Sequence, residues 1–474
     1  MDTALTRNIS KDAKRADALA RKIAGSVHLP GEAAYEEACR IWNAMIERRP
    51  QLVVRPGENA DIAQAIAFAR ANRLPLSVRG GGHNVAGAAL SDGGVTIDMS
   101  TRRGVVVDPA AMTVRVESGA TWKDVDAATQ PHGLVVPSGI ISATGVAGLT
   151  LGAGFGWTSR KFGFTADNLL SAEVVTSDGK TRRASADENA DLFWALRGGG
   201  GNFGVVTSFE FRAHRHGPQA LCGMVVHPFS RANEVMQVYR DVTAKAPDEL
   251  TCLLVLRKAP PAPFIPQEFH GKLIAAIAAH WTGDPAEGTE AMQPLKAFGP
   301  PVADMIAPKE FIAFQTFLDG GQPFGRRYYW KSDEAGEVSD GLMATLAECE
   351  SRIASPHSAI LVMHMGGAPS RVAPEATAVG IRKARYAVVV QGAWEDPAED
   401  KAHIGWARDS FNALKPFSSG AAYVNFLTAE EGETRLHAAY GNALYERLRR
   451  IKTTYDPDNL FRGNLNIPPM ASVA

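Results

Sequence analysis

The chain has 474 residues, which is too long for one hydrophobic core and predicts two or three domains. Its 50 lysines and arginines balance 51 aspartates and glutamates, so the charge does not favour binding to nucleic acid or to a membrane surface. The N-terminus has no apolar signal core and the sequence has no run of eighteen apolar residues, which predicts a cytoplasmic protein without a membrane span.

The cysteines and histidines do not form a recognisable metal-binding motif. None of the four cysteines belongs to a C-x-x-C pair, and no H-E-x-x-H motif occurs. We therefore expect no metal ion and no disulfide framework. The thiols expected to be reduced are those of Cys39, Cys222, Cys252 and Cys349.

Helical and strand patterns alternate in the first 130 residues. Apolar residues spaced three and four apart predict helices over 12–24, over 32–45, from Asn59 onward and over 122–129. Short apolar and β-branched runs predict strands at 52–54, 75–78, 95–99 and 113–117. No repeat is long enough to indicate a solenoid.

The predicted strand at 75–78 leads into three consecutive glycines, Gly80 to Gly82, and then into His83. Glycines allow a backbone turn with positive φ and leave N–H groups uncovered, so such a loop can close on a phosphate. Taken alone, the segment also fits an ordinary tight turn followed by a surface histidine. Three further glycine clusters within the next 125 residues favour a ligand-binding loop.

The segment 137–156 has too many glycines for a helix or a central strand, because each costs roughly 0.5–1 kcal/mol there. We expect its backbone to approach a ligand closely. The later segment 199–204 matches G-x-G-x-x-G, but it follows a predicted helix and precedes the strand 205–211. That order is the reverse of a dinucleotide-binding βαβ unit, and no P-loop motif occurs.

Beyond residue 216 the glycine density falls and alternating segments predict a second domain of about two hundred residues. Its predicted strands are 250–256, 273–281, 360–365 and 386–390, with a helix at 341–352. This pattern indicates an antiparallel sheet with helices on one face. The tail carries Tyr423-Val-Asn425 and a helix through Tyr440 to Thr453, which Pro457 ends.

Together these segments resemble one protein family. The motifs that carry the resemblance, in chain order, are Arg79-Gly-Gly-Gly-His83-Asn84, the glycine run 145–156, Lys161-Phe-Gly163 with Asp167-Asn168, 197–204, Tyr423-Val-Asn425 and 455–461. The chain resembles the berberine-bridge-enzyme-like FAD oxidases of the vanillyl-alcohol oxidase and p-cresol methylhydroxylase superfamily, and within them the bacterial 6-hydroxy-D-nicotine oxidase branch. The resemblance covers nearly the whole chain.

The resemblance implies an α+β fold with a two-subdomain PCMH-type FAD-binding domain and an antiparallel-sheet substrate domain. The implied divisions are an N-terminal helical segment at 1–45, the FAD domain at 46–217, the substrate domain at 218–420 and a tail at 421–474 that returns to the FAD domain. The residues implied to bind FAD are Arg79, Gly80, Gly81, Gly82, His83, Asn84, Gly87, Pro137, Ser138, Gly139, Thr144, Gly145, Gly148, Gly152, Gly154, Gly156, Asp167, Asn168, Gly204, Val205, Asn464 and Asn466.

His83 stands where the family attaches the flavin to an imidazole nitrogen. A neutral imidazole is a nucleophile near pH 7, so the residue type suits that chemistry. Members with a second flavin link carry a cysteine at the position of Ile141. The resemblance therefore implies covalent FAD with a single attachment, through His83.

The family's Y-x-N motif implies that Tyr423 and Asn425 are catalytic. A phenol has an ordinary pKa near ~10, so Tyr423 needs a nearby positive charge or hydrogen bond to act as a base. Tyr423 could instead be an aromatic residue of the interdomain core. Tyr440, Tyr386 and His364 are weaker candidates for the base, and each also fits a structural role.

The implied activity is an FAD-dependent oxidase that removes hydride from a C–H beside a hydroxyl or amine, with O2 as acceptor and hydrogen peroxide as product. Thr144, a small residue at the family's oxygen-gating position, favours O2 access. A dehydrogenase with another acceptor and a non-catalytic flavin protein are the alternatives. The substrate is expected to be a small molecule contacted by 324–330 and 363–368; the oligomeric state stays open.

Overall fold

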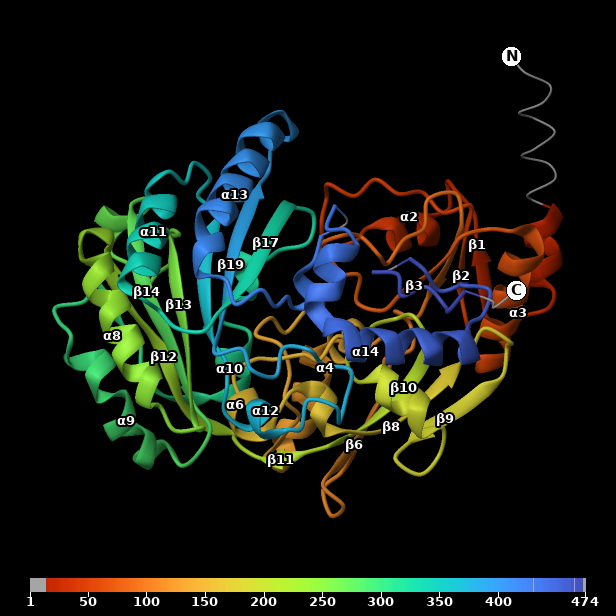
Figure 1. Ribbon diagram of the computed structural model, residues 1–474, viewed down its shortest axis with the longest axis horizontal. Coiled ribbons are helices and arrows are strands. Elements are labelled where there is room, and N and C mark those ends of the chain that lie inside the picture. Colours follow the sequence, from red (N-terminus) through yellow and green to blue (C-terminus); the bar gives the residue numbers. More distant parts are fainter. Residues whose placement is uncertain (1–13, 429, 464, 472–474) are drawn as a thin grey trace.

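The computed structural model describes residues 14–428, 430–463 and 465–471 (Figure 1). The fold is α+β, as the sequence predicts, and has two halves joined along a broad face. No helix in the described part of the chain is long and apolar enough to cross a membrane. All four cysteines are free thiols.

The N-terminal half contains a small sheet in the order β1-β2-β4-β3. Strands β2 and β3 both run parallel to β4, and the helix α3 (Asn59–Asn72) connects β2 to β3. The apolar stripe of α3 is buried, as predicted, and packs with the strands in one core. The strands are β1 (Ser26–His28), β2 (Leu52–Arg55), β3 (Leu76–Arg79) and β4 (Val95–Asp98).

A second, antiparallel sheet in the order β5-β6-β10-β8-β9 completes this half. Its strands are β5 (Val105–Asp108), β6 (Thr113–Glu117), β8 (Leu169–Val175), β9 (Thr181–Ser185) and β10 (Val205–Arg212). A short pair joins β7 (Leu134–Val135) and β11 (His214–Arg215). The helices of this half are residues 14–20, α2 (Ala33–Cys39), α4 (Trp122–Thr129), α5 (Val146–Leu151), α6 (Ser159–Phe162) and α7 (Ala190–Leu196).

Two predictions for this half are wrong. The helix expected over 32–45 ends at Cys39. The residues after Cys39 form backbone hydrogen bonds with the second half instead of continuing the helix. The glycine-rich segment 145–156 does contain a helix, α5, with Gly145 at its N-terminal cap and Gly148 inside it. The short helix tolerates Gly148 because tertiary packing of Val146 and Leu151 in the core outweighs propensity.

The second half is an eight-stranded sheet in the order β15-β12-β14-β13-β18-β19-β17, with β16 also paired to β12 (Figure 1). Its strand pairs are antiparallel, as predicted. The strands are β12 (Gln219–Pro228), β13 (Leu250–Lys258), β14 (Leu273–Trp281), β15 (Ala303–Asp304), β16 (Ala307–Glu310), β17 (Arg327–Ala335), β18 (Ala359–His364) and β19 (Tyr386–Trp394).

The long helices of this half cover one face of the sheet (Figure 1). On β13, Leu254 and Leu256 pack under these helices, whereas Leu253 and Val255 point to the opposite face, toward the N-terminal half. Both faces are therefore buried, which explains why β13 reads as a continuous apolar run. The covering helices are α8 (Ala232–Lys245), α9 (Pro285–Ala297), α11 (Asp340–Ser351) and α13 (Asp400–Leu414).

The remaining helices lie where the halves meet or in the tail. The tail helix α14 contacts α7 and so returns the chain to the N-terminal half. Gly441, with φ 66°, interrupts α14 by a kink. These helices are α10 (Phe311–Gln315), α12 (Ala368–Arg371) and α14 (Glu433–Tyr455). Single 3-10 turns are η1 (Gln130–His132), η2 (Thr165–Asn168), η3 (Phe229–Arg231), η4 (Gln267–Phe269), η5 (Asp319–Gly321), η6 (Pro397–Glu399), η7 (Lys415–Phe417) and η8 (Val424–Phe426).

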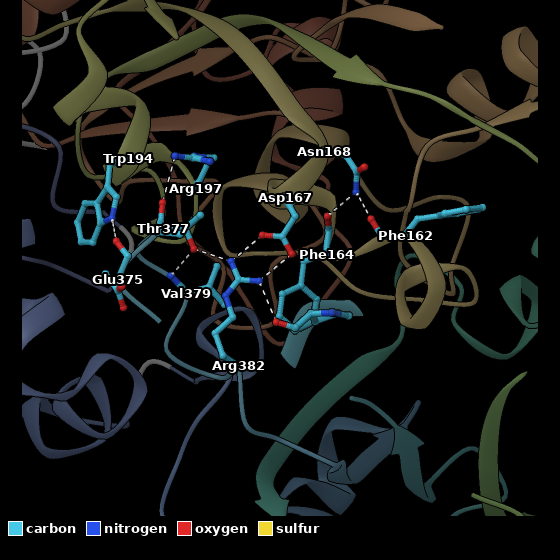
Figure 2. A network of polar contacts seen from close by, with 12 residues as sticks. Phe162, Phe164, Asp167, Asn168, Trp194, Arg197, Glu375, Thr377, Val379 and Arg382 are labelled. Atoms are coloured by element: carbon cyan, nitrogen blue, oxygen red, sulfur yellow. Dashed lines mark hydrogen bonds and ion pairs between the residues drawn. The ribbon is translucent and has the colours of Figure 1, made fainter. Parts of the chain in front are cut away.

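A buried ion pair joins the two halves (Figure 2). Arg382 donates from Nη2 and Nη1 to the two carboxylate oxygens of Asp167, over 2.6 and 2.7 Å, and also donates to Thr377 Oγ1. The guanidinium is 2% exposed, so neither charge can be solvated if its partner is lost. This contact holds the loop before β8 against the second half.

We expect Arg382→Met to lower the apparent free energy of unfolding by about 3–5 kcal/mol, because it leaves a buried carboxylate without its partner. Urea denaturation measures the change. Arg371→Met is the matched control, since the Arg371–Asp248 pair is exposed and should contribute little. Equal destabilisation by the two variants would contradict a special role for the buried pair.

Candidate active site

A cavity of about 300 Å³ lies between the two halves, within the usual size range of ligand sites. Glycine-rich loops of the N-terminal half form one side, and the helix-free face of the large sheet forms the other. The predicted site residues that line it are Gly80, Gly81, Gly82, His83, Asn84, Gly139, Thr144, Gly145, Gly148, Gly204, Tyr423 and Asn425.

Other predicted residues do not line this cavity. Those that lie behind or beside it are Arg79, Gly87, Pro137, Ser138, Gly152, Gly154, Gly156, Asp167, Asn168, Val205 and Asn466. Asn464 lies outside the described residues. The Asn466 side-chain oxygen is buried and has no hydrogen-bond partner among the described residues.

Three of these residues, Asp167, Asn168 and Arg79, make contacts within the protein beside the cavity. The Asp167 carboxylate is engaged by Arg382, and the Asn168 amide donates to the carbonyls of Phe162 and Phe164 (Figure 2). Arg79 Nη1 donates to Asp98 Oδ1 over 2.8 Å, beneath the glycine–histidine loop. These contacts support the loops around the cavity, and the predicted cofactor contacts of these three residues stay predictions.

Two glycine backbones touch at the floor of the cavity. A Cβ on Gly81 would lie 2.6 Å from Cα of Gly145, and a Cβ on Gly145 would lie 2.5 Å from N of Gly81. Such separations exclude any side chain at either position. The glycine–histidine loop can therefore lie directly against the loop that opens α5.

Two other glycines leave room for a ligand. A Cβ on Gly148 or Gly201 would meet no protein atom within 4 Å, and both residues line the cavity. Uncovered backbone of this kind suits the close approach of a cofactor to the N-terminal end of α5. The site thus fits the FAD that the glycine motifs imply.

His83 is held in an aromatic cage. Its ring stacks on Trp42, with centroids 4.5 Å apart and planes inclined by 15°, and the edge of Phe324 lies 5.9 Å away. The Nε2 atom is buried without a hydrogen-bond partner among the described residues. Burial lowers the pKa of His83 to about 4, so the imidazole is neutral at pH 7.

The segment after α2 fixes this cage. Asn43 donates from Nδ2 to the carbonyls of Val85 and Tyr328, over 2.8 and 2.9 Å, and accepts from the Tyr328 N–H. Trp42 lies between His83 and Tyr328, whose ring centroid is 3.6 Å from that of Trp42. Residues 42 and 43 thereby tie the glycine–histidine loop to strand β17.

Tyr423 lines the cavity and its phenol oxygen has two donors. The backbone N–H of Gly154 donates over 3.1 Å and Asn425 Nδ2 donates over 2.9 Å. Burial nevertheless raises the pKa of Tyr423 to about 12, because the two hydrogen bonds only partly offset desolvation. A nearby positive charge or a hydrogen bond is needed to lower the pKa of Tyr423. The structure supplies hydrogen bonds, but the net shift of the pKa is upward.

Asn425 is fixed as closely as Tyr423. It also donates to the Leu149 carbonyl over 3.1 Å, and a Cβ on Gly152 would fall 2.2 Å from its Oδ1. Gly152 therefore serves the site by making room for Asn425 rather than by contacting the cavity. The Tyr423–Asn425 pair is held by backbone groups in the last turn of α5 and in the loop that follows it.

The weaker candidates for a base do not line the cavity. Tyr440 donates to the Gly198 carbonyl over 3.0 Å, and the Tyr386 hydroxyl is hydrogen-bonded to Thr243. His364 stacks on Tyr386. Tyr440, Tyr386 and His364 thus make contacts inside the protein, which is the structural role expected from the sequence as the alternative for each of them.

Several wall residues were missed by sequence reasoning. They alternate along strands of the large sheet, as residues on one face must, but the sequence does not reveal which face meets the other half. These residues are Leu253, Val255, Arg257, Leu361, Val389 and Gln391. Of the expected segments 324–330 and 363–368, Trp330 and Met363 line the cavity.

Comparisons with known proteins agree with this site. Residues 50–185 match the FAD binding domain family, and 422–468 match the berberine and berberine-like family. The FAD-linked oxidoreductase YgaK of Bacillus subtilis is 30% identical over 460 residues, which cover 95% of this chain and 98% of YgaK. The chain belongs to the berberine-bridge-enzyme-like family of FAD-linked oxidoreductases.

Two further relatives are oxidases by name. The (R)-6-hydroxynicotine oxidase of Paenarthrobacter nicotinovorans is 28% identical, with 95% of this chain and 98% of that protein covered. The crystal structure of 6-hydroxy-D-nicotine oxidase from Arthrobacter nicotinovorans matches with a TM-score of 0.85 and 25% identity, covering 94% and 98% of the two chains.

We expect Gly148→Leu to lower the amount of FAD that the protein takes up without unfolding it. The new side chain enters the cavity, where overpacking costs ~1–3 kcal/mol, so the variant should carry less FAD than the wild type. Flavin absorbance per protein and circular dichroism measure the two effects. The control is Gly405→Leu, which changes a helix glycine that also has open space but lies away from the cavity, and it should keep its FAD. Full FAD content in both variants would contradict the assignment of this cavity to FAD.

Proposed function

We propose that this FAD-linked oxidoreductase is an oxidase that acts on a C–H beside a hydroxyl or amine. The substrate would lose a hydride from carbon and a proton from O–H or N–H, which leaves C=O or C=N. Oxygen would take up the two electrons and two protons as hydrogen peroxide. The observation that carries the proposal is the doubly hydrogen-bonded phenol of Tyr423 in the cavity that also receives His83.

FAD, when bound, supplies the hydride acceptor at N5. The residues that would hold it are the glycine loops on both sides of the Gly81–Gly145 contact, together with His83. Thr144 lines the cavity with a small side chain, which favours oxygen over a larger acceptor.

The proposal includes covalent attachment of FAD through His83 alone. A neutral, buried imidazole with an unpartnered Nε2 is suited to act as a nucleophile, since no hydrogen bond occupies that atom and its lone pair is free in the tautomer that is protonated at Nδ1. Ile141, which also lines the cavity, offers no thiol for a second link.

We expect the purified protein to stay yellow after acid precipitation, and His83→Ala to release its flavin on denaturation. Intact mass should show one FAD on the wild type and none on the variant. Peptide mapping should find flavin only on the peptide that contains His83. His132→Ala, at an exposed histidine, is the control and should keep the covalent flavin; flavin that washes out of the wild type in acid would refute the attachment.

Tyr423 is the proposed base. Two N–H groups donate to the Tyr423 oxygen from the protein side. The hydroxyl proton of Tyr423 is therefore free to exchange with a substrate in the cavity. The same donors stabilise the phenolate that results from ionisation. Phe155 and Phe426 pack against the ring, 5.0 and 4.8 Å from its centroid, and keep water from the oxygen's surroundings.

We expect Tyr423→Phe to keep its FAD but to slow anaerobic flavin reduction by substrate about 10²–10⁴-fold, the usual contribution of a positioned acid or base. Because the pKa of Tyr423 is raised to about 12, the wild-type rate should rise as the pH is raised above neutral, and this rise should be absent in the variant. Stopped-flow spectroscopy measures both.

Tyr440→Phe is the matched control, since it removes a phenol that is equally buried but hydrogen-bonded to Gly198 instead of lining the cavity. Its reduction rate should equal the wild-type rate. A normal rate and normal pH dependence in Tyr423→Phe would show that another group removes the proton.

A further inference from the structure

A buried amide without a partner lies in the second-domain wall of the cavity. Gln391 is 1% exposed, and neither Nε2 nor Oε1 has a hydrogen-bond partner among the described residues. Burying an unpaired amide is unfavourable, so such a side chain is normally matched by a polar group of a ligand. Gln391 lines the cavity, where a ligand can reach it.

The strand register shows what lies beside Gln391. Ala359 is paired with Gln391 on one side and with Arg257 on the other, so these three residues form one row across β19, β18 and β13. Strands are spaced about 4.8 Å apart, which places the backbones of Gln391 and Arg257 about 10 Å apart with only a methyl group between them. All three residues line the cavity. The row therefore forms a recess over Ala359, flanked by an amide and a guanidinium.

The Arg257 charge has no carboxylate partner within ion-pair distance in the described parts of the chain. Its hydrogen bonds go to the carbonyls of Lys258 and Pro356, over 3.1 and 3.3 Å. Burial raises the pKa of Glu350, which interacts with Arg257 electrostatically, well above the usual carboxyl range, and Glu350 forms no ion pair with Arg257 among the described residues. The adjacent Arg326, by contrast, is paired with Glu395 over 3.3 Å.

The rest of the wall is apolar. The next two rows of the same sheet face present Val389, Leu361 and Val255, and then Met363 and Leu253. Trp330, paired with Gln391 on its other side, closes the polar row with an indole. The wall thus has one polar, positively charged end and an apolar body.

We propose that Arg257 and Gln391 form an anion subsite that binds the carboxylate of an amphipathic organic acid, whose apolar part lies along the aliphatic rows. This inference rests on the proposed function, because it names the substrate class of the same cavity. A planar carboxylate can accept from the Arg257 guanidinium and from the Gln391 amide N–H at once. An acid of this class satisfies both groups that the protein leaves unpaired.

Isothermal titration calorimetry on the FAD-loaded protein tests the proposal. The probes are benzoate, phenylacetate and 3-phenylpropionate, each compared with its primary amide, which has the same shape without the charge. We expect at least one carboxylate to bind about tenfold or more tightly than its amide, as a charge-assisted hydrogen bond does relative to a neutral one.

Arg257→Met should weaken carboxylate binding by about ten- to hundredfold and abolish the preference over the amide. Gln391→Met should weaken both members of a pair by a similar factor, about two- to tenfold. Arg326→Met removes a nearby charge that is already paired and does not line the cavity, so it should leave the preference unchanged. If methionine at 257 prevents folding, Arg257→Gln tests the same loss of charge.

The proposal is overturned if no carboxylate binds, if carboxylates bind no tighter than their amides, or if the preference survives in Arg257→Met or Arg257→Gln. Binding is measured without turnover, so this result is independent of the oxidase assignment. A protein that prefers carboxylates but is reduced by no substrate would refute only the proposed function. Reduction by neutral substrates alone, without carboxylate binding, would refute only the anion subsite.

Discussion

The site depends on the contact between the backbones of Gly81 and Gly145, where neither position has space for a Cβ. Gly81 follows strand β3 of the small sheet, and Gly145 caps α5 after the antiparallel sheet begins. Their contact brings the His83 loop beside Thr144 and the exposed backbone of Gly148. Without it, the histidine and the cofactor loops would belong to separate surfaces.

The two halves contribute different chemistry to one cavity. The N-terminal half supplies backbone groups and a neutral imidazole, both suited to a fixed cofactor. The large sheet supplies side chains at paired positions of neighbouring strands, where one side chain can replace another without changing the backbone. Tyr423 and Asn425 come from the tail and are fixed by α5-region backbone groups, not by the sheet. Substitutions on the sheet can therefore alter substrate selection while the groups proposed for catalysis stay in place.

The sequence predicted local elements and motifs well, because glycine clusters, apolar periodicity and the Y-x-N motif are local signals. It placed strands β13, β14, β18 and β19 of the large sheet but not β12 and β17, and it directed attention to His83 and Tyr423. It did not predict that the segment at Trp42 leaves its helix to cage His83, since that depends on a contact with β17. Arg257 and Gln391 were missed for a similar reason: alternation gives two faces, and only tertiary packing shows which one meets the cavity. The ion pair of Asp167 was not predicted either, because its partner, Arg382, is 215 residues away.

The long sequence separation of the cavity's parts has a consequence for biosynthesis. His83, Trp330 and Tyr423 line one cavity, yet Tyr423 leaves the ribosome some 340 residues after His83. Contacts of such high order form late and slowly in folding. The complete cavity can therefore form only after the tail that carries Tyr423 has been translated.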